Sequence, residues 1–274
     1  MHEGDSRKIR LLRSEDVPAA FELSAEAGWN QTEDDWRLLL ALAPEGCFAI
    51  EADGRVAATT TLVCYQRRLA WIGMVLTRLE YRRQGLARRL LTKVLTHADH
   101  IGMETIKLDA TEQGRPLYEK FGFHAEQKIE RWSRPGGNVA ELPAAVRSWE
   151  PAWLELDLPA FGADRSRLLE MLAQRNKPAT ISRSYLFTRA GRMTAYAGPC
   201  VGENSETVRK LIEQRLQNTN CGWSWDLFPS NQGAVALARH FGFSPQRQLR
   251  RMVRGKPLRQ DENAMFAIAG FELG

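Results

Sequence analysis

The sequence predicts an α/β fold, with helices packed on an α+β mixed sheet, repeated in two similar domains. Two observations predict it. Apolar, β-branched runs alternate with amphipathic helical patterns through the first half of the chain. Much of that pattern returns in the second half, where Phe241-Gly242-Phe243 repeats Phe121-Gly122-Phe123 at an offset of 120 residues. The chain of 274 residues is long enough for two ordinary domains.

The composition is that of an ordinary globular protein, with 43% hydrophobic and 26% charged residues. No apolar run approaches about 18 residues, so we expect no membrane-spanning helix and no membrane partner. The first residues lack the apolar core of a signal peptide, and a cytoplasmic location is the default expectation. Much of the local excess in the net charge of +5 lies at residues 82–89, where an anionic cofactor explains it, so no nucleic-acid partner is expected.

Metal binding is not expected from the sequence. The four cysteines are scattered, at Cys47, Cys64, Cys200 and Cys221, and no two form a Cys-x-x-Cys pair. The His97-x-Asp99-His100 group is interpreted as a solvated helix surface, because no third ligand accompanies it.

The chain begins with a strand and two helices. Residues 9–12 form a short apolar run typical of a strand. Ser14, followed by two acidic residues, predicts a helix start, because a hydroxyl caps a helix and acids suit its positive end. Gly28 ends that helix. Thr32 caps a second helix over residues 35–43, which the next proline stops.

Three antiparallel strands come next. Residues 47–51 and 56–65 flank Asp53-Gly54, a pair typical of a tight hairpin turn. A second reversal near residues 66–68 leads into a third apolar strand that starts at Trp71.

A turn, a long helix, a strand and a short helix complete the first half. Apolar residues at helical spacing run from Leu86 to Leu95. Residues 105–110 are then expected to form a strand, and residues 116–121 a short helix.

The turn between the third strand and the long helix is suited to a pyrophosphate group. It contains Arg82-Arg83-Gln84-Gly85-Leu86-Ala87. A helix start offers free N–H groups to an anion. Gly85 and Ala87 allow a ligand to approach the backbone, and the surrounding arginines supply positive charge.

These residues resemble a known family. Arg82-x-x-Gly85-x-Ala87 is similar to the acyl-CoA loop of the GNAT superfamily of N-acetyltransferases, whose pattern is Arg/Gln-x-x-Gly-x-Gly/Ala. The strand residues 108–111 and the run Pro116 to Phe123 resemble the family's next strand and its closing helix and turn. The resemblance covers roughly residues 8 to 132. It implies two GNAT-like acyl-CoA N-acyltransferase domains in tandem, with acetyl-CoA as co-substrate.

The resemblance also implies the cofactor-binding residues. Main-chain N–H groups at the end of the third strand, exposed by a bulge, would polarise the thioester carbonyl. The loop would hold the rest of acetyl-CoA. The predicted cofactor-binding residues are Met74, Val75, Leu76, Thr77, Arg82, Arg83, Gln84, Gly85, Leu86, Ala87 and Arg88.

Tyr118 matches the family's catalytic tyrosine, which protonates the departing thiolate. Its alternative role is to pack with the apolar face of the short helix. No general base is identified: the candidates are Asp109, Glu33, Glu80, Glu112 and His124, or a water molecule.

Three residues are predicted to contact the acceptor substrate. Trp29 and Trp71 occupy segments that line the acceptor side in the family, and Asp109 lies at a strand end. For both tryptophans, packing in the core is the alternative. For Asp109, the alternative is a bond to nearby loop N–H groups.

The second half is a degenerate copy. Pro-rich and Gly-rich residues 133–151 suggest a linker, with an N-terminal domain at residues 1–140 and a C-terminal domain at 141–274. At the offset of 120 residues, Gly202 corresponds to Arg82, Ser205 to Gly85 and Ala238 to Tyr118. Glu203 and Glu206 stand where pyrophosphate would bind, and acidic groups repel phosphate. The copy is therefore expected to keep the fold without binding CoA.

The sequence thus predicts an acetyltransferase that acts on a primary amine of a small molecule. Two alternatives stay open: a protein acetyltransferase acting on lysine or an N-terminus, and a non-catalytic acyl-CoA sensor. A homodimer is also considered, although the second domain can take the place of a dimer partner.

Overall fold

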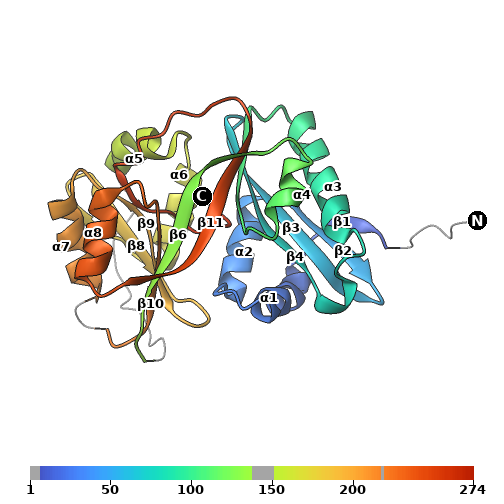
Figure 1. Cartoon of the computed structure of the whole chain (residues 1–274), viewed down its shortest axis with the longest axis horizontal. Helices are drawn as coiled ribbons and strands as arrows, with labels where there is room; N and C mark the ends of the chain where they lie inside the picture. Colours follow the sequence, from blue (N-terminus) through green and yellow to red (C-terminus); the bar gives the residue numbers. More distant parts are fainter. Residues whose placement is uncertain (1–6, 138–150, 217–218) are drawn as a thin grey trace, which may run out of the picture. The chain divides into compact units, whose positions relative to one another are not determined.

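The structure is a computed structural model that describes residues 7–137, 151–216 and 219–274 (Figure 1). Contacts between Cα atoms divide the chain into two compact units, unit 1 at residues 1–104 and unit 2 at residues 105–274. The predicted domain boundary between residues 140 and 141, and most of the predicted linker, lie outside the described residues.

Unit 1 is built on four antiparallel strands in chain order. They are β1 (Ile9–Leu11), β2 (Cys47–Ala52), β3 (Arg55–Tyr65) and β4 (Leu69–Thr77). The turn between β2 and β3 places Asp53 and Gly54 at positive φ, as the sequence predicts for a tight hairpin.

Helices cover both faces of this sheet. They are the short 3₁₀ turn η1 (Ser14–Asp16), then α1 (Val17–Glu26), α2 (Glu33–Leu42) and α3 (Leu86–His100). Cys47 contacts α2, since its Sγ lies 3.7 Å from the carbonyl oxygen of Leu39. Its neighbour Phe48 contacts α3, with its ring 5.8 Å from that of His97. Because successive side chains of a strand point to opposite faces, α2 and α3 lie on opposite sides of the sheet.

The predicted cap of α2 is present. The Thr32 hydroxyl accepts a hydrogen bond from the amide of Asp35 at 3.2 Å, and the Asp35 carboxylate accepts one from the amide of Thr32 at 2.8 Å. This reciprocal arrangement provides hydrogen-bond acceptors for two backbone N–H groups at the helix start and stabilises the start of α2 by about 1 kcal/mol.

Unit 2 contains one long mixed sheet. Its strand order is β5 (Thr105–Ala110), β11 (Ser244–Gly255), β6 (His124–Arg134), β10 (Trp223–Leu227), β9 (Ala195–Val201), β8 (Ser184–Arg189) and β7 (Ala179–Ile181), and β12 (Met265–Ala267) also pairs with β9. Its helices are α4 (Arg115–Glu119), η3 (Pro151–Trp153), α5 (Leu154–Phe161), α6 (Ser166–Arg175), α7 (Ser205–Leu216) and α8 (Gln232–His240).

The elements confirm the predicted repetition. We call residues 8–134 the first repeat and residues 151–274 the second repeat. The second repeat contains the same kinds of element in the same order as the first. The elements of the first repeat are α1, α2, β3, β4, α3, β5, α4 and β6, and their counterparts in the second are α5, α6, β8, β9, α7, β10, α8 and β11. The predicted strand at residues 105–110 matches β5, and the predicted helix at 116–121 is α4, shifted by one to two residues.

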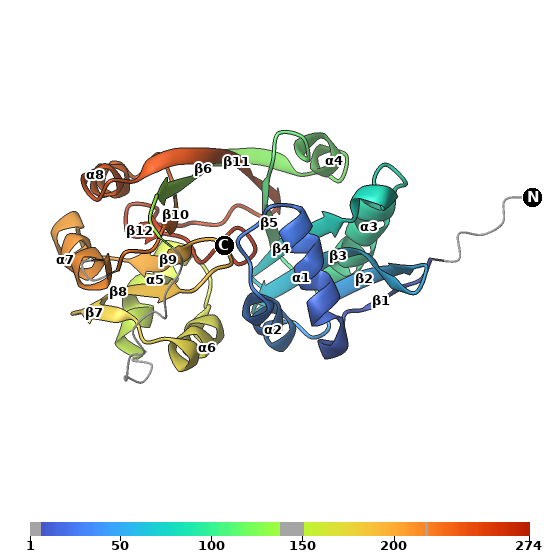
Figure 2. The same ribbon diagram turned by 90° about the horizontal axis from the view of Figure 1, so that it is seen from below.

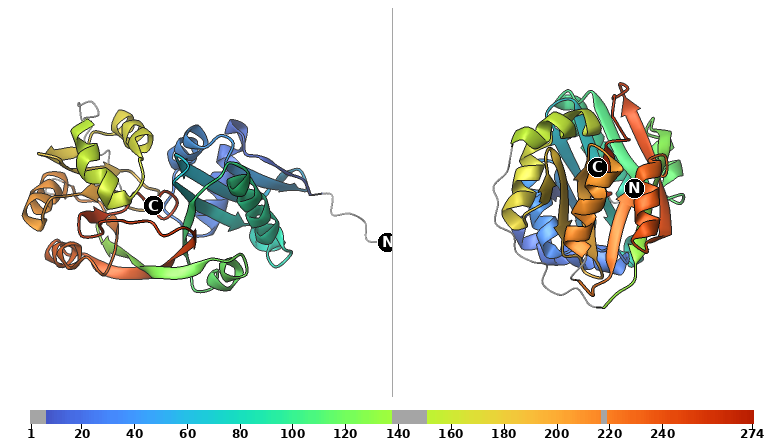
Figure 3. Two further views of the ribbon diagram at one scale, coloured as in Figure 1. Left: turned by 90° about the horizontal axis from the view of Figure 1, so that it is seen from above. Right: turned by 90° about the vertical axis from the view of Figure 1, so that its left-hand side faces the viewer.

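The repeats exchange a strand. β11, from the second repeat, lies between β5 and β6 of the first, and β6 lies between β11 and β10 of the second. β6 and β11 form a long antiparallel ribbon, with α4 near one end and α8 near the other (Figures 2 and 3). The hydrophobic pattern does not predict this exchange, because β6 and β11 have equivalent patterns.

Within the described residues, no helix has both the length and the apolar character needed to cross a membrane. No group of three or more His, Cys, Asp or Glu side chains in the same ranges is arranged to hold a metal ion.

Candidate active site

The loop before α3 leaves a helix start open to an anion. Gly85 precedes the helix with φ +81°, a left-handed conformation that favours glycine, and no side chain caps α3. A Cβ at this position would meet no atom within 4 Å, so the backbone borders open space. The first turn of α3 carries no acidic residue. These features suit a phosphate group bound by the N–H groups of the helix start.

Two side-chain hydrogen bonds hold the loop in place. The Arg82 Nε donates to the carbonyl oxygen of Thr77 at 3.1 Å, and the Gln84 amide nitrogen donates to the carbonyl oxygen of Glu80 at 2.9 Å. Arg82, Arg83 and Arg88 are exposed. The loop therefore presents fixed positive charge to solvent at the start of α3.

The predicted bulge is present in β4. Leu76 pairs with Thr59 and Gly73 pairs with Thr61, so Met74 and Val75 together face a single residue of β3. Met74 has φ +49°, and its carbonyl oxygen accepts a hydrogen bond from the Thr59 hydroxyl at 2.9 Å. Such a bulge bends β4 and re-aims its main chain shortly before the strand ends at Thr77.

Tyr118 lies in α4 of unit 2, whereas the loop belongs to unit 1. The half-buried ring of Tyr118 packs edge-on against Phe123, with 6.2 Å between ring centroids. Burial raises the pKa of Tyr118 to about 12. The phenol therefore stays protonated at neutral pH, as a proton donor must.

The three residues predicted to contact the acceptor lie in different settings. Trp71 is completely buried, and Trp29 is half-buried. The Asp109 carboxylate is also buried, and the Arg251 Nε and Nη2 each donate to one of its oxygens at 2.9 Å. Burial raises the pKa of Asp109, and the Arg251 charge opposes that rise. Contact with an acceptor stays a prediction for all three.

The structure does not single out a general base. Glu33 pairs with Arg37 at 2.5 Å, Glu80 with Arg55 at 2.7 Å and Glu112 with Arg115 at 3.0 Å, all on the surface, and His124 is exposed. Ordinary surface ion pairing accounts for these carboxylates.

Both halves of the chain resemble known proteins. A profile of the acetyltransferase (GNAT) family matches residues 11–123, and one of the acetyltransferase (GNAT) domain matches residues 153–267. The Bacillus subtilis (strain 168) protein described as uncharacterized N-acetyltransferase YitH is 30% identical over 221 residues, which cover 73% of this chain and 75% of that protein. The chain belongs to the acetyltransferase (GNAT) family.

Solved structures share its tandem fold. A Pyrococcus horikoshii protein solved as an acetyltransferase candidate has a TM-score of 0.82 at 22% identity, over 100% of this chain and 99% of that one. A tandem GNAT protein from the clavulanic acid biosynthesis pathway has a TM-score of 0.59 at 15% identity, over 91% of this chain and 98% of its own. The predicted fold of two GNAT domains in tandem is thus confirmed.

This GNAT protein is an acyltransferase, and its co-substrate is acetyl-CoA, the acetyl donor of the family. The residues of the first GNAT repeat fit that molecule. Gly85 leaves open space where a Cβ would lie, the start of α3 has no side-chain cap, and exposed arginines surround it.

The corresponding helix start in the second GNAT repeat is closed. The Asn204 side-chain oxygen accepts a hydrogen bond from the amide of Thr207 at 2.9 Å, which caps α7. Glu203 pairs with Arg183 at 2.7 Å. A Cβ on Gly202 would lie 2.1 Å from a methyl group of Val208, so this loop packs on its own helix.

The second GNAT repeat has its own bulge, but another strand covers it. Gly198 and Pro199 of β9 together face Phe187 of β8, as Met74 and Val75 face one residue of β3. Just beyond the bulge, Cys200 and Val201 pair with β12 (Figure 2). A Cβ on Gly198 would lie 2.2 Å from the carbonyl oxygen of Ile268.

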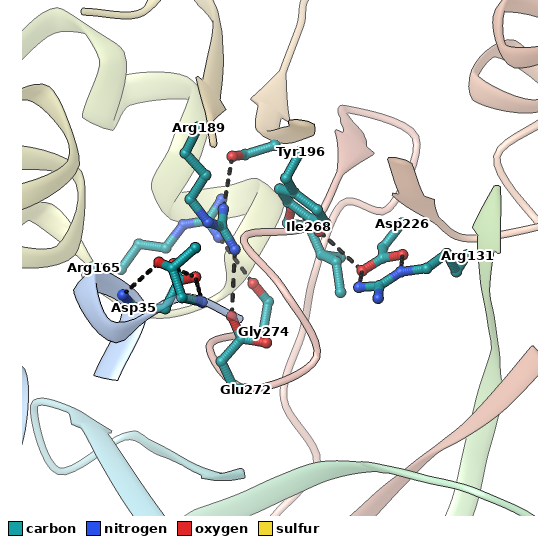
Figure 4. Close-up of polar contacts among 11 residues, drawn as sticks. Asp35, Arg131, Arg165, Arg189, Tyr196, Asp226, Ile268, Glu272 and Gly274 are labelled. Atoms are coloured by element: carbon teal, nitrogen blue, oxygen red, sulfur yellow. Dashed lines mark hydrogen bonds and ion pairs between the residues drawn. The ribbon is translucent and has the colours of Figure 1, made fainter. Parts of the chain in front are cut away.

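Further hydrogen bonds fix this covering segment, which we define as residues 264–274. The Trp225 indole N–H donates to the carbonyl oxygen of Phe266 at 2.7 Å. The Tyr196 hydroxyl donates to the carbonyl oxygen of Ile268 at 3.1 Å (Figure 4). Arg189 donates to Glu272 at 3.3 Å. The covering segment therefore lies against the bulge of β9 and pairs with the backbone just beyond it.

Sequence reasoning missed the covering segment. The apolar run from Met265 to Ala269 is a signal for a buried element. Nothing in that run indicates which strand edge it joins.

Proposed function

We propose that this GNAT protein transfers the acetyl group of acetyl-CoA to a primary amine of a small molecule. The observation that carries the proposal is the open helix start at Gly85, with its exposed arginines and the bulge in β4. The name of the Bacillus subtilis relative supports nitrogen as the acceptor atom.

Binding is assigned to the cofactor loop. The N–H groups that begin α3, together with Arg82, Arg83 and Arg88, hold the pyrophosphate of acetyl-CoA. Gln84, Leu86 and Ala87 complete the loop around Gly85, where a side chain would meet the ligand.

Carbonyl polarisation is assigned to the end of β4. As the amine nitrogen attacks the thioester carbon, negative charge develops on the carbonyl oxygen. Main-chain N–H groups within Met74–Thr77 stabilise that charge. Removing one such donor typically costs about 2.7 to 4 kcal/mol of transition-state stabilisation.

Protonation of the leaving thiolate is assigned to Tyr118. The carbon–sulfur bond breaks, the phenol proton passes to the sulfur, and CoA departs as the free thiol. The amine loses its own proton to water or to one of the candidate bases, and the Tyr118 phenolate regains a proton from solvent. The raised pKa of about 12 keeps the phenol protonated at neutral pH, so its proton is present when the thiolate forms.

The test is an acetylation assay with purified protein and a panel of small primary amines and peptides, read as release of free CoA thiol. We expect release with small amines. Acetylation of peptides alone would assign a protein substrate. Tight acetyl-CoA binding without transfer to any acceptor would indicate a sensor.

Two variants link the activity to the assigned residues. Gly85→Glu is expected to abolish activity, and Gly102→Glu is its matched control, since Gly102 has φ +72° and similar open space at the other end of α3. Tyr118→Phe is expected to lower kcat by roughly 100-fold with acetyl-CoA binding retained. Unchanged turnover would remove Tyr118 from the mechanism.

A further inference from the structure

The strand exchange places a residue of the second repeat beside the strand that leads to Tyr118. β5 ends at Ala110, and β11 pairs with it in the register Arg251 to Asp109 and Arg250 to Ala110. Within unit 2, the end of β5 is therefore held by the second repeat.

The Arg251 to Asp109 contact is a rigid, buried ion pair. Two parallel hydrogen bonds of 2.9 Å join them, and both side chains are completely buried. The guanidinium also stacks on Phe228, 4.7 Å from the ring centroid. Bidentate geometry fixes orientation as well as distance, which a lysine does not reproduce.

A short chain of contacts leads from this pair to Tyr118. Thr111 lies two residues after Asp109, and its hydroxyl accepts a hydrogen bond from the amide of Gly114 at 3.0 Å. A Cβ on Gly114 would lie 3.3 Å from the Tyr118 ring, so that ring packs directly on the Gly114 backbone. The position of the β5 end thus sets the turn on which the tyrosine rests.

The second repeat contains the equivalent pair without the tyrosine. Arg131 of β6 donates to Asp226 of β10 at 2.7 and 2.6 Å (Figure 4). The helix that follows β10 carries Ala238 at the position of Tyr118. Arg131 is therefore a natural control, because it makes the same two-bond contact with an aspartate, is 14% exposed where Arg251 is fully buried, and has no tyrosine in the helix that follows.

We propose that Arg251 of the second repeat is a positioning residue for Tyr118 of the first, acting through Asp109 and the end of β5. This inference rests on the proposed role of Tyr118. It gives the second repeat a part in the reaction, although its own helix start is closed.

The test compares Arg251→Lys with Arg131→Lys in the full-length protein. Each lysine keeps the charge and loses the bidentate contact. We expect Arg251→Lys to lower kcat by about 10-fold, because small displacements of a catalytic group are costly, with the KM for acetyl-CoA unchanged within about twofold. Arg131→Lys should leave kcat unchanged while lowering the melting temperature to a similar degree.

A double-variant cycle separates positioning from general stability. If Arg251 acts through Tyr118, adding Arg251→Lys to Tyr118→Phe should cause no further loss of kcat. Additive losses, equal losses from Arg251→Lys and Arg131→Lys, or no loss from Arg251→Lys would each overturn the proposal.

A second variant keeps the proposal testable if Arg251→Lys does not fold. Phe228→Leu loosens the stacking on Arg251 and leaves both charges in place. Phe228→Leu should lower kcat by less than Arg251→Lys does, and only when Tyr118 is present. If Phe228→Leu lowers kcat equally in the wild-type and Tyr118→Phe backgrounds, the inference is refuted. If Tyr118→Phe alone leaves turnover unchanged, the proposed acid fails first, and the two failures are thereby told apart.

Discussion

The two GNAT repeats share a bulge, a following helix and the order of elements, yet their helix starts differ. α3 begins at an uncapped glycine that borders open space, whereas α7 begins under its own Asn204 cap, with Glu203 paired to Arg183. In the second repeat, β12 also pairs with the backbone just past the bulge. One fold thus leaves this helix start open in one copy and caps it in the other.

The covering segment also contributes to folding. The covering segment buries Met265, Phe266, Ile268 and Leu273, which are at most 3% exposed. Burial of each large apolar side chain contributes about 1.5 to 3 kcal/mol. The covering segment is therefore part of the core of the second repeat.

The largest predicted effect concerns acetyl-CoA binding. We expect one acetyl-CoA per chain by isothermal titration calorimetry, and none in Gly85→Glu, because the glutamate places a negative charge where the pyrophosphate binds. Gly102→Glu should still bind one. Two equivalents per chain, or one equivalent left in Gly85→Glu, would contradict the contrast between the repeats.

The next effect is on stability. Phe266→Ala should lower the free energy of unfolding by about 3 to 5 kcal/mol, because it leaves a cavity beneath the covering segment. Denaturant unfolding measures this loss. Where the variant stays folded, acetyl-CoA should still raise its melting temperature, since the cofactor loop belongs to unit 1 and Phe266 to unit 2. A large loss of affinity would show that the covering segment serves the first site.

A smaller effect is expected at high pH. The folded state holds the Tyr118 proton up to a pKa of about 12, while the unfolded chain releases it near pH 10. Between these values the unfolded state binds fewer protons, so stability falls as pH rises, by up to about 2 kcal/mol from this group. Denaturant unfolding at pH 9 and pH 11 should show a shallower fall in Tyr118→Phe, and equal falls would contradict the assigned burial.

The smallest predicted effect tests whether the glutamate charges or the covering segment prevents acetyl-CoA binding in the second repeat. Replacing Glu203 and Glu206 with glutamine removes surface ion pairs and should change stability by less than about 1 kcal/mol. Calorimetry should still find one acetyl-CoA per chain, because β12 remains in place. A second equivalent would show that repulsion by the glutamates alone had kept the ligand out.

Much of the fold could be predicted because local signals decide it. Thr32 predicts the start of α2, Asp53-Gly54 predicts the turn between β2 and β3, and the apolar spacing from Leu86 to Leu95 predicts α3. The cofactor loop is also local, since strand, glycine and helix follow one another in the chain.

Long-range partners could not be predicted in the same way. β6 and β11 carry matching residues, such as Arg131 and Arg251, so their patterns are equally compatible with either neighbour. The ion pair of Asp109 joins residues 142 positions apart, and opposite charges occur at many such separations. Local periodicity carries no information on which of these partners meet.

The exchanged strand also sets the order in which the chain can be completed during synthesis. β5 and β6 leave the ribosome well before β11, which must later enter between them. Until then, both strands present unpaired edges of the kind that promote aggregation. The first repeat is thus finished only when nearly the whole chain has been made, and a chain cut between the repeats would lack the strand that joins β5 to β6.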